Sequence, residues 1–381
     1  MVTDEAPTRI STPVRLRING IDMARALAMV GMVMVHIGPQ EAADPGLAAA
    51  AYRSAHGRAA ILFIVLAGIG VSLLIGDRST ARLETATTRL AWRAVVLLPA
   101  GLALQTLEIN VAVILQYYAV YFLLATALMR LSDRLLLLAA ALSATLGPAL
   151  IIWLQQTAPW WFQSGVPDWH DASRIMRDIM ITGYYPVVVW AAPLTIGMWT
   201  GRRQLRERRV AIALCVGGIV AATAGFVLSD TLVARLGAAF GPDDWRQLYL
   251  IEPHNEMPLW VLTSTAIATA LVGMCLLVAR ALPRFTWPLV AFGQLALTTY
   301  VAHLLVLELR PQWLLRDAIG QAWISVARFT VVGVVLATVY RTVAARGPFE
   351  MLLRPAWSRP ARPAAAVSDA SGRTSESRGR G

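Results

Sequence analysis

Four of the five histidines in this chain, together with one intramembrane arginine, are the residues whose types and positions could do chemistry. An imidazole titrates near neutral pH, so it can act as a general base or as a nucleophile that accepts an acyl group. The candidates for such a catalytic role are His36, His56, His254 and His303. Arg25 and His36 belong to one apolar run, and their spacing puts them within about 20° of one helix face and roughly 16 Å apart along the axis.

A polar residue lies close in sequence to Arg25, and another lies close to His303. Asp22 precedes Arg25 by one helical turn, which predicts a charge pair at one end of the helix and an imidazole near the other. Tyr300 and His303 share a face in a second apolar run. An alternative is also open at this stage: Asp22 and Arg25 reach the lipid headgroups as interfacial residues, and His36 only caps its helix.

The composition requires elements that cross a membrane. Of the 381 residues 57% are hydrophobic and 15% are charged, and a soluble domain carries roughly a quarter charged residues. Apolar runs close to the ~20 residues that span the hydrocarbon fall near 20–38, 59–76, 90–107, 110–129, 135–154, 182–200, 210–228, 259–279, 286–307 and 321–340. The sequence therefore predicts an all-α, polytopic integral membrane helical bundle with about ten transmembrane helices.

The distribution of arginine predicts the orientation of these helices. With both termini in the cytoplasm, the inner segments hold 24 arginines and the outer loops hold eight. The positive-inside rule thus favours an arrangement with the N-terminus in and the C-terminus in. All five histidines then fall in the outer half, so we expect imidazoles from distant parts of the chain to meet in one outer cavity, joined by a passage to an arginine-lined inner entrance.

Three segments follow from this organisation. Residues 1–19 form a cytoplasmic N-terminal segment without a cleavable signal, and 20–355 form the transmembrane domain. Residues 356–381, rich in Pro, Ala, Ser and Arg, form a disordered basic cytoplasmic tail whose natural partner is anionic membrane lipid rather than nucleic acid. Cys215 and Cys275 lie inside apolar runs, so neither a disulfide nor a metal site is predicted.

Several motifs resemble known families. The run 17–28 (RINGIDMARALA), followed by Val35-His36, resembles the first helix of bacterial heparan-α-glucosaminide N-acetyltransferase-like membrane proteins. The run 56–63 (HGRAAILF) is similar to their second helix. The runs 293–300 (GQLALTTY) and 347–354 (GPFEMLLR) resemble the overlapping YeiB-like family of bacterial membrane proteins. The spacing from Arg25 to His36 also matches the arginine–histidine pattern of membrane acyltransferases of the type-three family.

The chain departs from the family pattern at two places. Family members usually have Arg-Gly where this chain has Arg25-Ala26. In the eukaryotic members the catalytic histidine lies in the loop after the first helix, and the spacing of His56 from the second helix differs here. The resemblance therefore leaves the family role with His56, with His36 or with neither.

The resemblance implies an integral-membrane acyltransferase in the bacterial plasma membrane. Such an enzyme moves an acyl group, acetyl above all, from cytoplasmic acetyl-CoA to an extracytoplasmic amine or hydroxyl of a glycan or amino sugar. Arg25, Arg89 and Arg93 would bind the phosphates of the acyl-CoA donor, while Arg58 and Tyr300 would bind the acceptor. A homodimer is an assembly that the sequence leaves open.

Two other classes of function remain open. A secondary transporter or exporter of a small solute would use helices interrupted at Pro99-Ala100-Gly101, Gly147-Pro148 and Pro193. No internal repeat relates the two halves of the chain, which disfavours that class. A non-catalytic sensor or scaffold would have no use for the intramembrane charges and histidines.

Overall fold

The computed structural model describes residues 17–39, 46–109, 111–162 and 171–355, and within these ranges it contains helices and loops but no strand. The prediction of an all-α protein is thus confirmed. The predicted basic tail 356–381, residues 1–16 of the N-terminal segment, and His170 lie outside the described residues.

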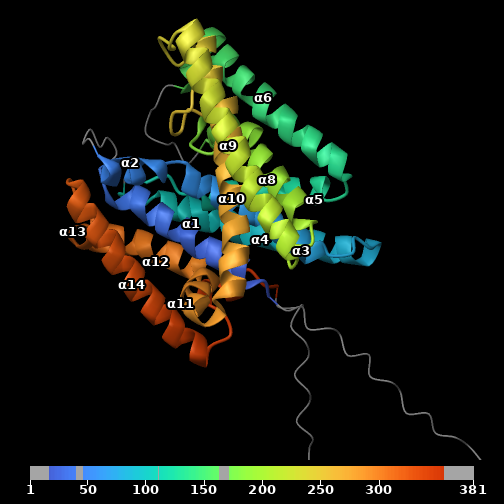
Figure 1. Cartoon of the computed structure of the whole chain (residues 1–381), viewed down its shortest axis with the longest axis vertical. Helices are drawn as coiled ribbons and strands as arrows, with labels where there is room; N and C mark the ends of the chain where they lie inside the picture. The colour runs from blue at the N-terminus through green and yellow to red at the C-terminus, as the bar shows by residue number, and fades with distance from the viewer. Residues whose placement is uncertain (1–16, 40–45, 110, 163–170, 356–381) are drawn as a thin grey trace, which may run out of the picture.

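The chain folds into a bundle of long helices connected by short ones (Figure 1). The long helices are α1 (Asn19–Ile37), α3 (Arg58–Ile75), α4 (Thr80–Gln105), α5 (Leu115–Leu128), α6 (Asp133–Thr157), α8 (Val187–Gly201), α9 (Arg208–Leu236), α10 (Pro258–Ala281), α11 (Pro283–Gln294), α12 (Ala296–Leu309) and α14 (Ile319–Val343). The short ones are α2 (Leu47–Ser54), η1 (Pro159–Phe162), α7 (Ala172–Arg177), η2 (Asp178–Thr182), η3 (Trp245–Tyr249), α13 (Pro311–Leu314) and α15 (Pro348–Leu352).

Six helical segments of the described chain are long and apolar enough to cross a membrane, and eight are if each of two bent pairs counts as one span. The predicted count of ten is therefore not confirmed. Helix α5 has 14 residues, roughly 21 Å at 1.5 Å per residue, which is short of the ~30 Å hydrocarbon core. Helix α4 is long enough, but Arg82, Glu84, Arg89 and Arg93 make its first half polar.

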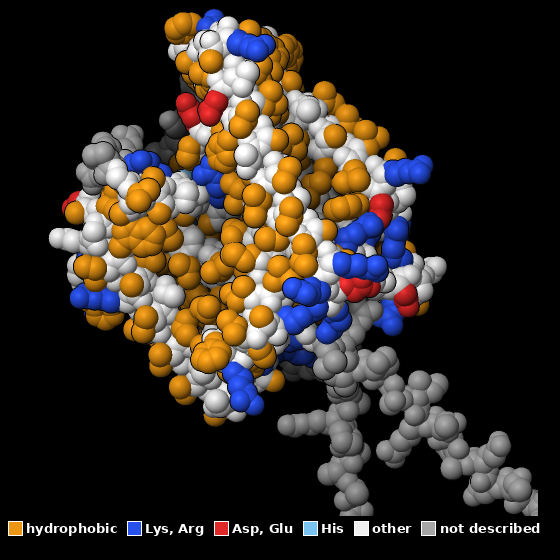
Figure 2. All heavy atoms as spheres, in the orientation of Figure 1, with side chains coloured by type: hydrophobic (Ala, Val, Ile, Leu, Met, Phe, Trp, Pro, Cys, Tyr) orange, Lys and Arg blue, Asp and Glu red, His pale blue; other side chains and the backbone are white. Residues whose placement is uncertain are grey.

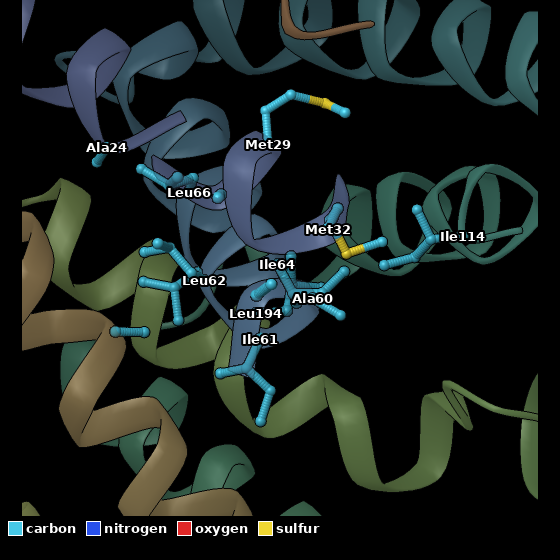
Figure 3. Close-up of a cluster of buried hydrophobic side chains, with 14 of the residues drawn as sticks. Ala24, Met29, Met32, Ala60, Ile61, Leu62, Ile64, Leu66, Ile114 and Leu194 are labelled. Carbon is cyan, nitrogen blue, oxygen red and sulfur yellow. The ribbon is translucent and has the colours of Figure 1, made fainter. Parts of the chain in front are cut away.

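The centre of the bundle is formed by α1 and α3, which pack against α8 and α10. Of the candidate spans, the one in α1 is 72% buried, whereas those in α9 and α14 are each 22% buried. Figure 3 shows part of this core, with Met32 of α1 beside Ile64 and Ala60 of α3, and Met29 further along α1. The burial of α1 explains how its polar residues come to face protein rather than lipid.

Close helix packing in the core depends on small residues. A Cβ on Gly68 of α3 would lie 2.1 Å from the Leu194 carbonyl oxygen, and a Cβ on Gly197 of α8 would lie 2.2 Å from that of Val65. Because neither glycine carries a side chain, the two backbones approach each other directly, as is common in membrane helix pairs.

The peripheral helices expose apolar side chains along their outer faces. Val216, Ile219, Val220 and Val227 of α9 are each more than half exposed, and α14 exposes a similar row. In Figure 2 hydrophobic side chains cover the middle of α9, while arginines gather around the lower ends of α8 and α9. This separation of apolar and basic surface is what a bilayer and its headgroups require.

The helices do not break where the prolines predict. Pro99, Pro148 and Pro193 lie inside the continuous helices α4, α6 and α8. The breaks occur instead between η2 and α8, where the segments are bent by 56°, and at Leu295 between α11 and α12, where the bend is 65°. Both breaks border cavities that are described below.

Candidate functional site

Two histidines that are far apart in the sequence are in direct contact. His36 in the last turn of α1 and His303 of α12 place Nδ1 and Nε2 2.9 Å apart, a hydrogen bond whose donor depends on the tautomers. Their rings are stacked, with centroids 5.2 Å apart. Both side chains are buried. The pair therefore holds an N–H between two imidazoles in a site from which water is largely excluded.

Aromatic rings surround this pair. The Tyr300 ring lies edge-on to His303 at 5.1 Å, and the Phe329 ring lies at 6.3 Å. Nδ1 of His303 has no hydrogen-bond partner with good geometry among the described residues, the nearest acceptors being the carbonyls of Tyr300 and Thr299.

His56 lies near the pair, in the turn between α2 and α3. His56, His254 and His303 are all within electrostatic range of His36. Both ring nitrogens of His56 are buried, and no described residue hydrogen-bonds them with good geometry. Tyr52 of α2 packs on the His56 ring at 5.7 Å and donates its hydroxyl to the carbonyl of Met34 in α1. Helix α2 thereby ties His56 to the histidine end of α1.

Gly57 sets the position of His56. It has φ +69°, a conformation that favours glycine, and a Cβ there would lie 2.4 Å from the Trp260 ring. The same Trp260 ring lies 6.1 Å from that of His254. One tryptophan of α10 therefore supports both the His56 segment and the His254 segment.

We expect Gly57→Ala to lower the melting temperature of the purified protein and to reduce its activity, because the new methyl group displaces Trp260. Gly46→Ala is the matched control, since Gly46 also has positive φ (+118°) but a methyl group added there would meet no heavy atom within 4 Å. Thermal unfolding of both variants separates backbone strain from the clash. Equal losses in the two variants would contradict a packing role for Gly57.

The segment before α10 is wound into an unusual backbone. His254 has φ +59° and Glu256 has φ +61°, both in the left-handed region that residues other than glycine rarely adopt. Between them, the Asn255 side chain donates to the Leu250 carbonyl at 3.2 Å and accepts from the backbone N–H of Met257 at 3.1 Å. Such strained positions concentrate at functional sites.

Glu256 is a buried carboxyl group with one oxygen still available. The Trp190 indole donates to Oε2, while Oε1 is buried without a hydrogen-bond partner among the described residues. Burial raises the pKa of Glu256 to about 8, although the indole hydrogen bond acts in the opposite direction. Burial, and secondarily the neighbouring His56, lowers the pKa of His254 to about 4. At neutral pH the segment thus presents a neutral imidazole and a protonated carboxyl group.

Both residues line a cavity of about 710 Å³, here called the His254 cavity. Its size lies within the ~300–1,000 Å³ of small-molecule sites. Other polar residues of this cavity come from α4, α5 and η2, and they include Gln105, Gln116, Tyr117 and Asp178. Carboxyl, amide and hydroxyl groups that point into one cavity can hydrogen-bond a polar, uncharged or cationic ligand.

A second cavity, of about 480 Å³, is strongly basic and is here called the arginine cavity. Its cationic lining residues come from both ends of the described chain and from α4; they are Arg17, Arg25, Arg89, Arg93, Arg346 and Arg354. Its other lining residues are mostly apolar or aromatic, and they include Tyr118 and Tyr300.

Asp22 partly compensates the charge at this cavity. Its carboxylate lies 2.6 Å from Nη1 of Arg25 and 2.9 Å from Nε of Arg17, and Gln294 donates to it at 3.3 Å. Asp22 itself is buried, so the charge pair predicted from the sequence is present. Among the described residues no carboxylate forms an ion pair with Arg89 or Arg93.

The first turn of α5 separates the two cavities. Ile114 and Leu115 line the arginine cavity, while the next two residues, Gln116 and Tyr117, line the His254 cavity. The Ile114 N–H donates to the Tyr300 hydroxyl at 3.2 Å, which connects this partition to the ring that packs on His303. The sequence predicted one continuous passage from an arginine-lined entrance to the histidines. The structure instead has two cavities, and the first turn of α5 lies between them.

Not every predicted site residue lies in a cavity. Among the four histidines, only His254 lines one of the two cavities, and His36, His56 and His303 line neither. Arg25, Arg89, Arg93 and Tyr300 all line the arginine cavity. Arg58 lines neither: it donates to the Ser54 carbonyl at 3.2 Å, and its guanidinium lies 6.0 Å from the Phe226 ring.

Glu256 and Gln116 are site residues that the sequence motifs did not indicate. Glu256 lies among other acidic residues before α10, and nothing local shows that its carboxyl group is buried. Gln116 had a usable signal: it is a polar residue in an apolar run, and such residues are usually functional. Among the described residues, no three His, Cys, Asp or Glu side chains converge as metal ligands.

Comparison with known proteins agrees with the sequence motifs. Residues 17–226, more than half of the chain, match the family model described as heparan-alpha-glucosaminide N-acetyltransferase, catalytic. This range includes His36, His56 and the arginines of α1 and α4, and it ends before His254. The YeiB-like resemblance of the last third lies beyond it and stays a prediction. No curated protein matches the chain. The chain belongs to the catalytic-domain family of the heparan-α-glucosaminide N-acetyltransferases, a family of membrane acetyltransferases.

Proposed function

We propose that this protein, in a bacterial plasma membrane, transfers an acetyl group from cytoplasmic acetyl-CoA to an amine or hydroxyl of an extracytoplasmic sugar. The observation that carries the proposal is the pair of cavities on the two sides of the first turn of α5. One is lined by six arginines and the other by His254 and Glu256, with the His36–His303 pair beside the wall.

The arginine cavity suits the donor. CoA carries a pyrophosphate and a 3′-phosphate, and guanidinium groups bind phosphate through paired hydrogen bonds. Arg89 and Arg93 lie four residues apart on α4, so they present their charges on the same face. The apolar wall that leads to Tyr300 would hold the pantetheine arm and direct the thioester toward His303.

The His254 cavity suits the acceptor. Gln105, Gln116 and Asn255 supply amide groups that can hydrogen-bond hydroxyl groups. Asp178 and Glu252 supply carboxylates that favour an amine, although Arg174 and Arg177 lie in the same cavity. These groups support a sugar or amino sugar as the acceptor class.

Two routes would transfer the acetyl group, and both use a histidine. In the direct route the acceptor nitrogen or oxygen forms a bond to the thioester carbonyl carbon, the C–S bond breaks, the imidazole takes the acceptor proton, and the CoA thiolate is protonated. In the two-step route an imidazole nitrogen attacks the carbonyl carbon, the C–S bond breaks, and the CoA thiolate takes the proton that the imidazole loses. The acceptor then attacks the acyl-imidazole, the bond from the carbonyl carbon to the ring nitrogen breaks, and that nitrogen takes the acceptor proton, which regenerates the histidine. The buried His36–His303 pair and His56 are the candidates for this imidazole.

A transfer assay in proteoliposomes tests the proposal. Labelled acetyl-CoA is supplied on one side and glucosamine on the other, and labelled product is measured. We expect Arg89→Gln with Arg93→Gln to raise KM for acetyl-CoA at least about tenfold, since each lost charged hydrogen bond costs about 1.5–3 kcal/mol. Arg284→Gln, an exposed arginine outside both cavities, is the control. Absence of labelled product with a panel of amines and sugars would refute the proposal.

A secondary transporter is the second candidate, and the two bent helix pairs favour it, because broken helices often form transport sites. The same proteoliposomes distinguish the two functions. Passage of intact glucosamine without consumption of acetyl-CoA would support transport, whereas acetylated product would support transfer.

A further inference from the structure

The motif 347–354 (GPFEMLLR) lies outside the family-matched range, and the proposed function assigns phosphate binding by name only to Arg89 and Arg93 of α4. Residues 346–354, here called the C-terminal strap, follow α14 and contain the short helix α15. Arg346, Glu350, Leu353 and Arg354 of this segment line the arginine cavity. The strap is therefore a wall of the cavity that α1 and α4 also line.

The strap is fixed by hydrogen bonds to two other elements. Glu350 accepts from the backbone N–H of Thr298 at 3.0 Å and from its hydroxyl at 2.5 Å, at the start of α12. The Trp92 indole of α4 donates to the Leu352 carbonyl at 2.8 Å. These contacts hold the backbone that carries Arg346 and Arg354 at a defined place beside α4.

Glu350, which holds the strap on α12, is the only carboxylate among the described residues that line the arginine cavity. Both Glu350 oxygens are bonded to Thr298, and none of the described ion pairs includes Arg346 or Arg354. Burial, and then the charges of Arg354, Arg17 and Arg341, lowers the pKa of Arg346. The guanidinium groups are therefore close enough to repel one another, and a bound anion would relieve that repulsion.

We propose, on the basis of the proposed function, that the C-terminal strap completes the donor site, with Arg346 and Arg354 binding a phosphate group of CoA together with Arg89 and Arg93 of α4. The ligand chemistry is a phosphorylated head joined to an apolar arm, because the same cavity is lined by arginines and by apolar and aromatic side chains such as Tyr300. An anionic phospholipid has related chemistry, so the experiment must distinguish the two.

The test measures CoA binding by calorimetry to the full chain in phosphatidylcholine nanodiscs. We expect Arg346→Gln with Arg354→Gln to weaken CoA binding about 10- to 100-fold. Replacing both residues by lysine should restore part of the affinity, since charge remains. Thr298→Val, which removes the hydroxyl hydrogen bond to Glu350 but keeps the backbone hydrogen bond and every arginine, should weaken binding severalfold. Arg284→Gln is the control and should bind CoA like the wild type.

Kinetics supplies a second readout that a loss of folding would not imitate. In the transfer assay the Arg346→Gln, Arg354→Gln double variant should raise KM for acetyl-CoA and leave kcat at saturation within about twofold. With S-acetylpantetheine, which lacks the nucleotide, the double variant and the wild type should be equally slow. A fall in kcat at saturation with unchanged KM would overturn the assignment.

The outcomes separate this proposal from the proposed function. If the wild type binds no CoA, the proposed function fails and the strap site fails with it. If the wild type binds CoA and the double variant binds it equally well, the strap site alone is overturned. If the double variant binds CoA as tightly as the wild type but has lost binding of phosphatidylglycerol, the strap holds a lipid headgroup and the donor assignment is overturned.

Discussion

His36→Asn is expected to reduce kcat for acetyl transfer about 10²- to 10⁴-fold while the protein stays folded, because this change removes the titratable ring and keeps a hydrogen bond. The asparagine amide can occupy the place of Nδ1, the atom that lies 2.9 Å from Nε2 of His303. The amide can neither take a proton from the acceptor nor carry an acetyl group. The measurement is kcat in proteoliposomes, with the melting temperature recorded for the same sample.

His303→Gln is the matched variant on α12, because the glutamine amide can reach the place of Nε2. If the two imidazoles work as one unit, the double variant should be no slower than the slower single variant. His56→Ala measures whether the third imidazole shares the role, a question the sequence left open. Full activity after replacement of both His36 and His56 by alanine would contradict the catalytic assignment.

Between pH 6.5 and pH 8.5 the stability of the wild type is expected to fall. Glu256→Gln is expected to abolish most of this decline. The pKa of Glu256 is raised from 4.5 to about 8, so between these values the folded protein holds a proton that the unfolded chain releases. The free energy of unfolding therefore falls as pH rises through this range. Glutamine mimics the neutral acid at every pH, so the variant should show a smaller decline in melting temperature.

The titration of His254 changes the free energy of unfolding in the opposite direction and over a lower pH range. Its pKa is lowered from 6.5 to about 4, so its contribution rises with pH between about 4 and 6.5 and then stays constant. Tyr117, Tyr121 and Tyr185 are near Glu256, and their hydroxyls stay protonated between pH 6.5 and 8.5. The decline above pH 6.5 is therefore assigned to Glu256.

The control for this experiment is Glu252→Gln, which changes an exposed carboxylate in the same segment. This variant should keep the wild-type decline. If Glu256 also donates a proton during acetyl transfer, the wild-type transfer rate should fall above about pH 8. The rate of Glu256→Gln should not show this fall. An identical stability decline in Glu256→Gln and the wild type would show that the carboxyl group is not buried as a neutral acid.

The sequence could predict the parts of this protein that depend on local pattern. Each of the ten apolar runs coincides with helix over most of its length, because a hydrocarbon environment leaves the backbone no other way to satisfy its polar groups. The count of spans was less accurate, since a buried helix such as α5 can be apolar without being long enough to cross. The positions of Arg25 and His36 on one helix face also followed from helical geometry.

The pairings between distant residues could not be predicted. His36 meets His303 because α1 and α12 cross at that depth, and neither residue's neighbours in the sequence specify the crossing. Gln116 and Ile114 are two residues apart and line different cavities, a separation that arises only where α5 begins against α4 and α12.

By itself, then, the sequence determined the all-helical membrane class, the family and which polar residues lie within apolar runs, because these depend on composition and periodicity. Only the tertiary structure decided that two cavities share one wall, that Glu256 is buried with a free oxygen, and that the C-terminal strap adds two arginines to a cavity begun by α1 and α4. The physical reason is that side-chain partners, and the solvent exclusion that shifts a pKa, are set by the packing of helices distant in the chain.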